Sequence, residues 1–229
     1  MATEKLSSKA PVTIINCSFD EDEAVTLHVG PTEHALLAHG NFISRRSEFF
    51  KAALKKQWTE GQTRIVKLPD EDSEVVTHYL SYVYSKCLPT NIFTKDFFGT
   101  FPEEFDEYYQ LLAELYVLGE RLLDETIRGA LIKEFLRLAK LTDKHGDQYH
   151  PKGEAVNVIY RGTTASSPVR RMMVNFHVTY GVTKWFDSTC GGGFVLDVVQ
   201  SLFHQMPAHS AAAVSTMRAN LMEASEYLS

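Results

Sequence analysis

The chain has 229 residues, of which 44% are hydrophobic and 23% charged, an ordinary globular mixture that argues against disorder. Its formal net charge of −6 lacks the basic excess that phosphate backbones attract, so direct nucleic-acid binding is not expected. No apolar run approaches the roughly 20 residues of a membrane span. The polar start, Met1 to Lys9, lacks the apolar segment of a secretory signal.

Cysteine usage points to a reducing compartment. Cys17, Cys87 and Cys190 are far apart and odd in number, so neither a disulfide framework nor a CxxC metal pattern follows. Reduced, mostly packed thiols fit these positions best. We therefore expect the protein in the cytoplasm or the nucleus.

Strand signals occupy the first third of the chain, after a tail over residues 1–20. Residues 12–15 are a short strand candidate, and the acidic run at 20–23 is typical of a solvated loop. Apolar residues alternate with polar ones over 25–29, which predicts a strand with one buried face. A Gly-Pro turn signal follows, and 34–38 is expected to return as a hairpin partner. Residues 64–68 form a further strand candidate, stopped by a proline.

Helical spacing appears between these strands and then dominates the chain. Phe42, Ile43, Arg46, Phe49, Phe50, Ala53 and Leu54 recur at helical spacing, which predicts one amphipathic helix from Asn41, in a region closed by Gly61. Further helices are predicted from Asp72 or Ser73 to Tyr84, from Pro102 to Tyr116 and from Asp124 to Leu138. The stretch 86–102 reads as an ordered loop.

The C-terminal part of the sequence contains no strand pattern. Residues 141–165 are polar and broken, so we expect a connection there. A helix should begin at Pro168, after Ser167 as its cap, and a flexible break at 191–193 should precede the next one. The stripe of that helix consists of Val195, Val198, Val199, Leu202 and Met206. A last helix should carry Val214, Met217, Leu221, Ala224 and Leu228.

Several ordered elements of the first half resemble the BTB/POZ family. The resemblance consists of Val25 to Gly30, Ala38-His39, Arg46 to Phe50, Trp58-Thr59-Glu60, Ile65 to Leu68, the turn at 69–72, and Tyr79 to Tyr84. Residues 111–122, and 160–163 with 166–171, are similar to regions of fungal BTB proteins. The resemblance implies an α+β fold, with a small mixed sheet flanked by helices over 21–140 and an all-helical region over 141–229.

The same resemblance implies self-association. Many BTB domains dimerise through the first strand and the first helix, which assigns Val25 to Val29 and Phe42 to Phe50 as the self-contact region. The residues named for this surface are Val25, Leu27, Phe42, Phe49 and Phe50. Filling of the monomer core by the three phenylalanines remains the alternative. Because Phe49 and Phe50 are adjacent, only one of them can face fully inward on a helix, and the other is a candidate for a partner surface.

A subset of the family links substrates to cullin-type ubiquitin ligases through a hydrophobic-x-Glu motif. Trp58-Thr59-Glu60 fits this motif in position and residue type. In the alternative interpretation, Trp58 covers the local core and Glu60 is a solvated loop charge. Ala24 and Gly40 stand where the repressor branch of the family has a charged pair, which argues against corepressor recruitment. Any substrate protein is then unknown, and an assembly or transcription-regulatory scaffold without a ubiquitin connection is the alternative function.

Enzymatic patterns are weak throughout. The glycines at 191–193 lack phosphate-loop spacing, and Cys190 with His177 or His204 lacks any surrounding catalytic signature. His145 with His150, and His204 with His209, offer no HExxH pattern. His39 is expected to be structural. We therefore predict no enzyme activity and assign no catalytic, cofactor-binding or metal-binding residues.

Overall fold

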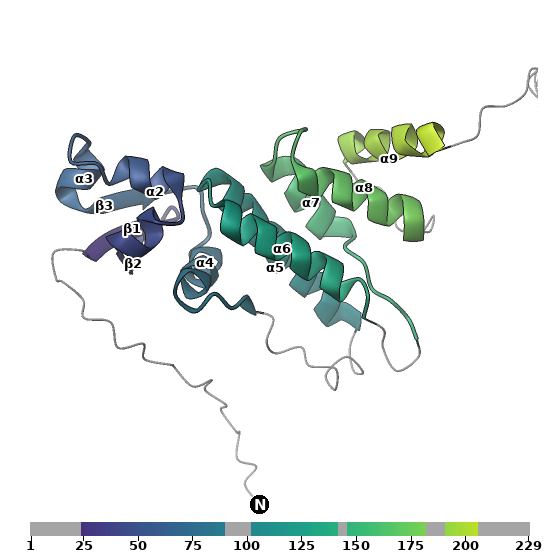
Figure 1. Ribbon diagram of the computed structural model, residues 1–229, viewed down its shortest axis with the longest axis horizontal. Coiled ribbons are helices and arrows are strands. Elements are labelled where there is room, and N and C mark those ends of the chain that lie inside the picture. Colours follow the sequence, from purple (N-terminus) through teal and green to yellow (C-terminus); the bar gives the residue numbers. More distant parts are fainter. Residues whose placement is uncertain (1–23, 90–101, 142–145, 182–190, 206–229) are drawn as a thin grey trace, which may run out of the picture. The chain divides into compact units, whose positions relative to one another are not determined.

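The computed structural model describes residues 24–89, 102–141, 146–181 and 191–205 (Figure 1). The predicted strand at 12–15, the acidic run at 20–23 and the predicted helix at 214–228 lie outside these residues. The chain divides into two compact units, residues 1–73 and 74–229.

The first unit contains a three-stranded mixed sheet. Its strands are β1 (Ala24–Val29), β2 (His34–His39) and β3 (Ile65–Leu68), in the order β2-β1-β3. The central strand β1 pairs antiparallel with β2 and parallel with β3. Val25, Leu27 and Val29 are fully buried, as their alternation with polar residues predicts. The predicted mixed sheet and its hairpin are thus confirmed.

The predicted helix from Asn41 is two helices, α1 (Gly40–Ser44) and α2 (Glu48–Ala53). Ser47 separates them with an extended backbone, and its buried side chain accepts a hydrogen bond from the Phe50 amide at 3.1 Å. Serine competes for backbone hydrogen bonds in this way, which favours a helix start over a helix interior. The prediction of one continuous helix was therefore wrong at Ser47.

A third short helix, α3 (Thr59–Thr63), precedes β3. Gly61 was expected to close this region, but it lies inside α3. The helix ends at Arg64, whose left-handed backbone (φ 59°) leads into β3. The Arg64 carbonyl accepts a hydrogen bond from the Thr26 amide at 2.9 Å, which ties the end of α3 to the central strand.

The second unit is helical throughout its described residues. Its helices are α4 (Ser73–Ser85), α5 (Pro102–Arg121), α6 (Glu125–Leu138), α7 (Gly153–Gly162), α8 (Pro168–Tyr180) and α9 (Gly192–Gln205). α5 packs against α6 and α7, while α8 packs against α7 and α9 (Figure 1). The predicted stripes of α5 and α6 are confirmed, because their apolar residues are buried: Phe105, Tyr108, Tyr109, Leu112, Leu115 and Tyr116 on α5, and Ile127, Leu131, Phe135 and Leu138 on α6.

The connection predicted over 141–165 contains α7, so that prediction was wrong. Ala155, Val156 and Ile159 are buried, a stripe too short to stand out among the charged residues around it. Gly162 allows α7 to approach α5 closely, because a Cβ atom there would lie 2.4 Å from a methyl carbon of Val117.

The stripe predicted for α9 is also displaced. Phe194 and Val198 are its buried residues, whereas Val199 and Leu202 are exposed. The expected flexible break does not extend through 191–193, because Gly192 and Gly193 form the first turn of α9. A long run of apolar residues lets a helix turn either face inward, so neighbouring helices decide which face is buried.

A buried carboxylate ties α4 to the α5–α6 turn. Asp124 caps α6 by accepting hydrogen bonds from the Thr126 and Ile127 amides at 2.9 and 3.1 Å. Its second oxygen accepts a hydrogen bond from the Tyr79 hydroxyl at 3.2 Å. Both side chains are fully buried, so this hydrogen bond pairs two polar groups that are shielded from water.

We predict that Asp124→Ala lowers the free energy of unfolding by about 1–3 kcal/mol, because it removes the helix cap and the acceptor of a buried hydroxyl. Tyr79→Phe removes only the hydroxyl and should cost about 1 kcal/mol. Urea denaturation followed by circular dichroism measures both variants. An equal effect of the two substitutions would contradict a capping role for Asp124.

Candidate protein-interaction surface

The residues predicted for a partner surface divide into buried and accessible groups. Val25, Leu27 and Phe50 are fully buried in this chain. Their direct contribution is to the core beneath the surface. Phe42, Phe49, Trp58 and Glu60 retain exposed area and are the members that a partner can contact directly.

The two accessible phenylalanines lie on separate short helices, Phe42 on α1 and Phe49 on α2. Phe49 meets the ring of Phe50 edge to face, with ring centroids 5.3 Å apart, and Phe42 meets His39 in the same way at 6.0 Å. Each ring is half-buried. These contacts fix the orientation of rings that still present part of their apolar surface.

Trp58 is the most exposed aromatic residue of this group. It stands at the start of α3, with 53% of its surface accessible. Its amide donates a hydrogen bond to the Lys55 carbonyl at 2.9 Å, and its carbonyl accepts one from the Gln62 amide at 3.1 Å. The backbone of Trp58 is therefore held on both sides while the indole remains largely accessible.

Gly61 makes this arrangement sterically feasible. A Cβ atom at this position would lie 2.2 Å from the Lys55 carbonyl oxygen and 2.9 Å from that of Leu54. Only glycine allows α3 to lie this close to the preceding chain. The Gln62 amide group reinforces the contact by donating a hydrogen bond to the Lys56 carbonyl at 3.1 Å. Glu60 follows Trp58 by two residues, in the first turn of α3, and its side chain is exposed.

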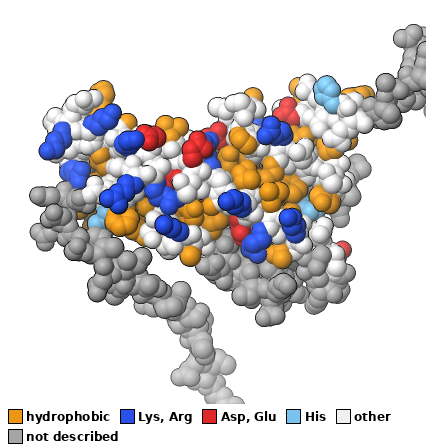
Figure 2. Space-filling model, in the orientation of Figure 1, with side chains coloured by type: hydrophobic (Ala, Val, Ile, Leu, Met, Phe, Trp, Pro, Cys, Tyr) orange, Lys and Arg blue, Asp and Glu red, His pale blue; other side chains and the backbone are white. Residues whose placement is uncertain are grey.

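The surroundings of Trp58 are rich in positive charge. Lys51, Lys55 and Lys56 are exposed, and Lys51 pairs with Glu48 at 2.9 Å. Figure 2 shows Lys and Arg side chains gathered over the first unit. Exposed pairs such as Lys51–Glu48 contribute little to stability, so these charges act mainly on the approach of partners.

Two apolar residues of the outer sheet face were missed by the sequence analysis. Leu37, 74% exposed, and Ile65 both lie opposite Thr26, on β2 and β3 respectively. They form an apolar row across the face that points away from Val25 and Leu27. Side chains alternate between the two faces of a strand, so an outward-facing Leu37 could have been predicted only if the buried face of residues 34–38 were known.

The stretch from Tyr160 to Arg171 is a structural junction of the second unit. The Tyr160 hydroxyl donates to Asp197 on α9 at 2.7 Å, and burial together with this carboxylate raises the pKa of Tyr160. Arg170 donates to the Tyr160 carbonyl at 2.6 Å and to the Thr163 hydroxyl at 3.0 Å. Ser167 does not cap α8 with its side chain but donates to Glu120 on α5 at 3.0 Å.

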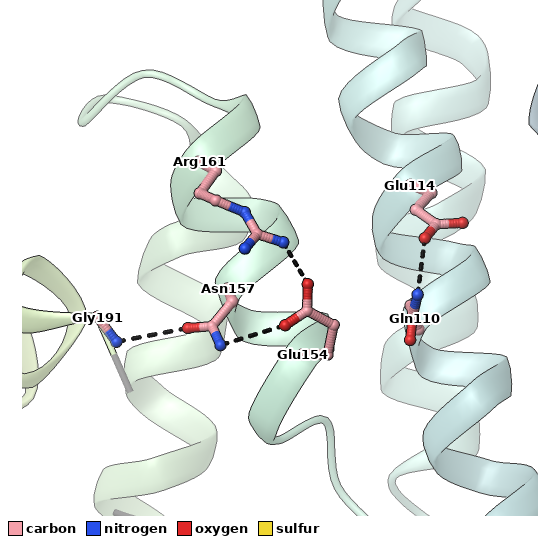
Figure 3. A network of polar contacts seen from close by, with 6 residues as sticks. All are labelled: Gln110, Glu114, Glu154, Asn157, Arg161 and Gly191. Carbon is pink, nitrogen blue, oxygen red and sulfur yellow. Dashed lines mark hydrogen bonds and ion pairs between the residues drawn. The ribbon is translucent and has the colours of Figure 1, made fainter. Parts of the chain in front are cut away.

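Figure 3 shows a second tie between α7 and the start of α9. Asn157 donates to Glu154 and accepts a hydrogen bond from the Gly191 amide, and Glu154 also pairs with Arg161. The polar residues Glu154, Asn157 and Arg161 of α7 therefore have structural hydrogen bonds and ion pairs. Residues 160–163 and 166–171, which resemble fungal BTB proteins, likewise contain residues that join helices, namely Tyr160, Ser167 and Arg170.

The histidines considered for catalysis have structural surroundings. Burial lowers the pKa of His177, whose Nδ1 lies 3.0 Å from the Met173 carbonyl and whose ring meets Phe194 edge-on. Burial, with a smaller contribution from His177, also lowers the pKa of His150, which stacks on Tyr180. His204 is exposed at the end of α9.

Cys190, considered as a nucleophile, and His145 and His209, considered as metal ligands, lie outside the described residues. Within the part of the chain that the structure describes, no three His, Cys, Asp or Glu side chains gather as a metal site. In the same part of the chain, no helix is both long and apolar enough to cross a membrane.

The first unit is thus a mixed sheet whose crossover helices present apolar and charged side chains at the surface. Residues 19–115 match the model of the BTB/POZ domain family. These residues therefore form a BTB/POZ domain, and such domains mediate protein–protein interactions. None of the curated proteins compared with the chain matches it.

We predict that Gly61→Ala lowers the free energy of unfolding by about 1–3 kcal/mol, because its Cβ atom would overlap backbone atoms that cannot withdraw. Gly129→Ala is the matched control: no atom lies within 4 Å of that Cβ position on α6, so the change should stabilise by about 0.4–1 kcal/mol. Thermal denaturation of both variants tests the difference. A neutral Gly61→Ala would show that α3 does not need glycine.

Proposed function

We propose that this BTB/POZ protein is an adaptor that self-associates through its first unit and docks a cullin-type scaffold through Trp58 and Glu60. The observation that carries the proposal is the exposure of Trp58 on a backbone fixed by hydrogen bonds. The protein that such an adaptor would recruit is not specified by these residues. The cytoplasm and the nucleus are the compartments proposed for it.

Trp58 and Glu60 have the properties of a compact binding hot spot. Tryptophan is enriched among residues that dominate binding energy, because one side chain buries a large apolar area. A fixed backbone lowers the entropy lost on binding, since α3 need not order when the partner arrives. Glu60 adds a carboxylate that can pair with a cation or accept hydrogen bonds at the rim of the same contact.

The self-association surface proposed here comprises Phe42 and Phe49 together with Leu37 and Ile65. All four side chains retain accessible apolar area in the first unit. Exposed apolar groups of this kind gain stability when a second copy covers them. Val25, Leu27 and Phe50 support this surface from the core without themselves reaching a partner.

We predict that the purified chain has the mass of a dimer in light scattering, and that Phe49→Asp converts it to a folded monomer. The introduced charge would be desolvated in the dimer but could reach water in the monomer, because Phe49 is only half-buried. Phe50→Asp should instead unfold the first unit, since Phe50 is fully buried. A wild-type monomer, or a dimer unaffected by Phe49→Asp, would contradict this surface.

For the scaffold contact, we predict that the wild-type chain retains a cullin in a pull-down and that Trp58→Ala with Glu60→Ala reduces binding by at least about tenfold. Leu123→Ala with Glu107→Ala is the matched control, because both side chains are exposed and belong to the second unit. No cullin binding at micromolar concentration by a dimeric wild-type chain would favour the assembly or transcription-regulatory scaffold instead.

A further inference from the structure

The second unit carries an apolar groove between α6 and α8, with a volume of about 380 Å³. Ile132 and Leu136 line it from α6, and Met172, Phe176 and Tyr180 line it from α8. Leu136 is 42% exposed and Tyr180 49% exposed, so the groove opens to solvent. A groove of this volume can hold one or two large apolar side chains of a ligand.

The rim of the groove is positively charged. Arg171 lines it on α8, and the exposed Lys133 follows the lining residue Ile132 on α6. The sequence of α8 contains no acidic residue. Of the two carboxylates of α6, Glu134 is held by Arg137 at 2.6 Å and Glu125 pairs with Arg128. Figure 2 shows hydrophobic side chains gathered over α6 and α8, with Lys and Arg side chains around them.

We propose that this groove docks an acidic amphipathic helix of a partner protein. The groove runs between helices of 14 and 13 residues, each about 20 Å long, so a third helix can lie along both. Its apolar residues would enter between Leu136 and Met172, and its carboxylates would meet Lys133 and Arg171. The concave, two-helix shape favours a helical ligand over a membrane surface, which a protein contacts with a convex apolar face.

The positive charge beside the groove favours an acidic partner. Although the chain as a whole carries −6, Arg171 in the lining and the exposed Lys133 next to Ile132 would attract carboxylates to this place. Under the proposed adaptor function, this groove is the surface that receives the recruited protein, and that role rests on the proposed function. The binding itself depends only on the second unit.

The test uses the full chain and a labelled peptide of about 18 residues, roughly five helical turns. The peptide places leucines on one helical stripe and glutamates beside them, and a comparator has lysines in place of the glutamates. We expect fluorescence anisotropy to show the acidic peptide binding at least about tenfold more tightly than the comparator, with affinity falling as salt is added.

Variants locate the binding. Leu136→Asp and Arg171→Glu should each weaken binding of the acidic peptide by about tenfold, and Lys133→Glu with Arg171→Glu should favour the lysine peptide. Leu123→Asp and Lys86→Glu are matched controls, exposed and outside the groove, and should change binding by less than about twofold. Trp58→Ala with Glu60→Ala should leave it unchanged, so failure of the cullin contact and failure of the groove are distinguishable.

Four results would overturn the proposal. The first is equal binding of both peptides, or binding unaffected by the groove variants. The second is sedimentation with vesicles of anionic phospholipid without any peptide binding, which would assign the surface to a membrane. The third is a change of oligomeric mass in Leu136→Asp, which would assign it to a second copy. The fourth is peptide binding that occurs only after Met217→Asp with Leu221→Asp, which would assign the groove of the intact chain to its own C-terminal segment.

Discussion

The parallel pairing of β1 with β3 is the constraint on which the first unit depends. Parallel neighbours cannot be joined by a tight turn, so the chain must leave the sheet and return by a longer crossover. That crossover contains α1, α2 and α3, which carry Phe42, Phe49 and Trp58. These three residues, unlike Leu37 and Ile65 on the strands, are therefore located where the sheet topology requires helical connections.

Within that crossover, local chemistry decides how the interaction residues are presented. Ser47 caps the start of α2, three residues after the end of α1, and on α2 Phe50 lies in the core while Phe49 is half-buried. Gly61 lets α3 lie against the chain at 54–55, and this contact holds Trp58 at the surface. A serine and a glycine, neither of which contacts a partner in the proposed function, thus control the geometry of the residues that would.

The second unit depends on polar ties between helices more than its sequence indicates. Asp124 receives hydrogen bonds from its own helix and from Tyr79, Arg170 links α8 to the end of α7, and Tyr160 reaches Asp197 on α9. The ties of Tyr79 to Asp124 and of Tyr160 to Asp197 join residues 45 and 37 positions apart in the chain, whereas Arg170 and Tyr160 are 10 positions apart. These ties use polar residues of α7, α8 and α9, while the apolar groove between α6 and α8 remains open to solvent.

Short-range patterns in the sequence determined the strands and the stripes of α5 and α6, because alternation and helical spacing report local burial directly. Trp58 and Glu60 stand out in the sequence only through their resemblance to a family motif. The split at Ser47, the helix α7 and the buried face of α9 were decided by tertiary structure. At Ser47 the cause is a local hydrogen bond that competes with the helix. At α7 it is a contact distant in sequence, between Gly162 and Val117. The α6–α8 groove is likewise invisible to periodicity, since it exists only where two helices 30 or more residues apart along the chain come to line one depression.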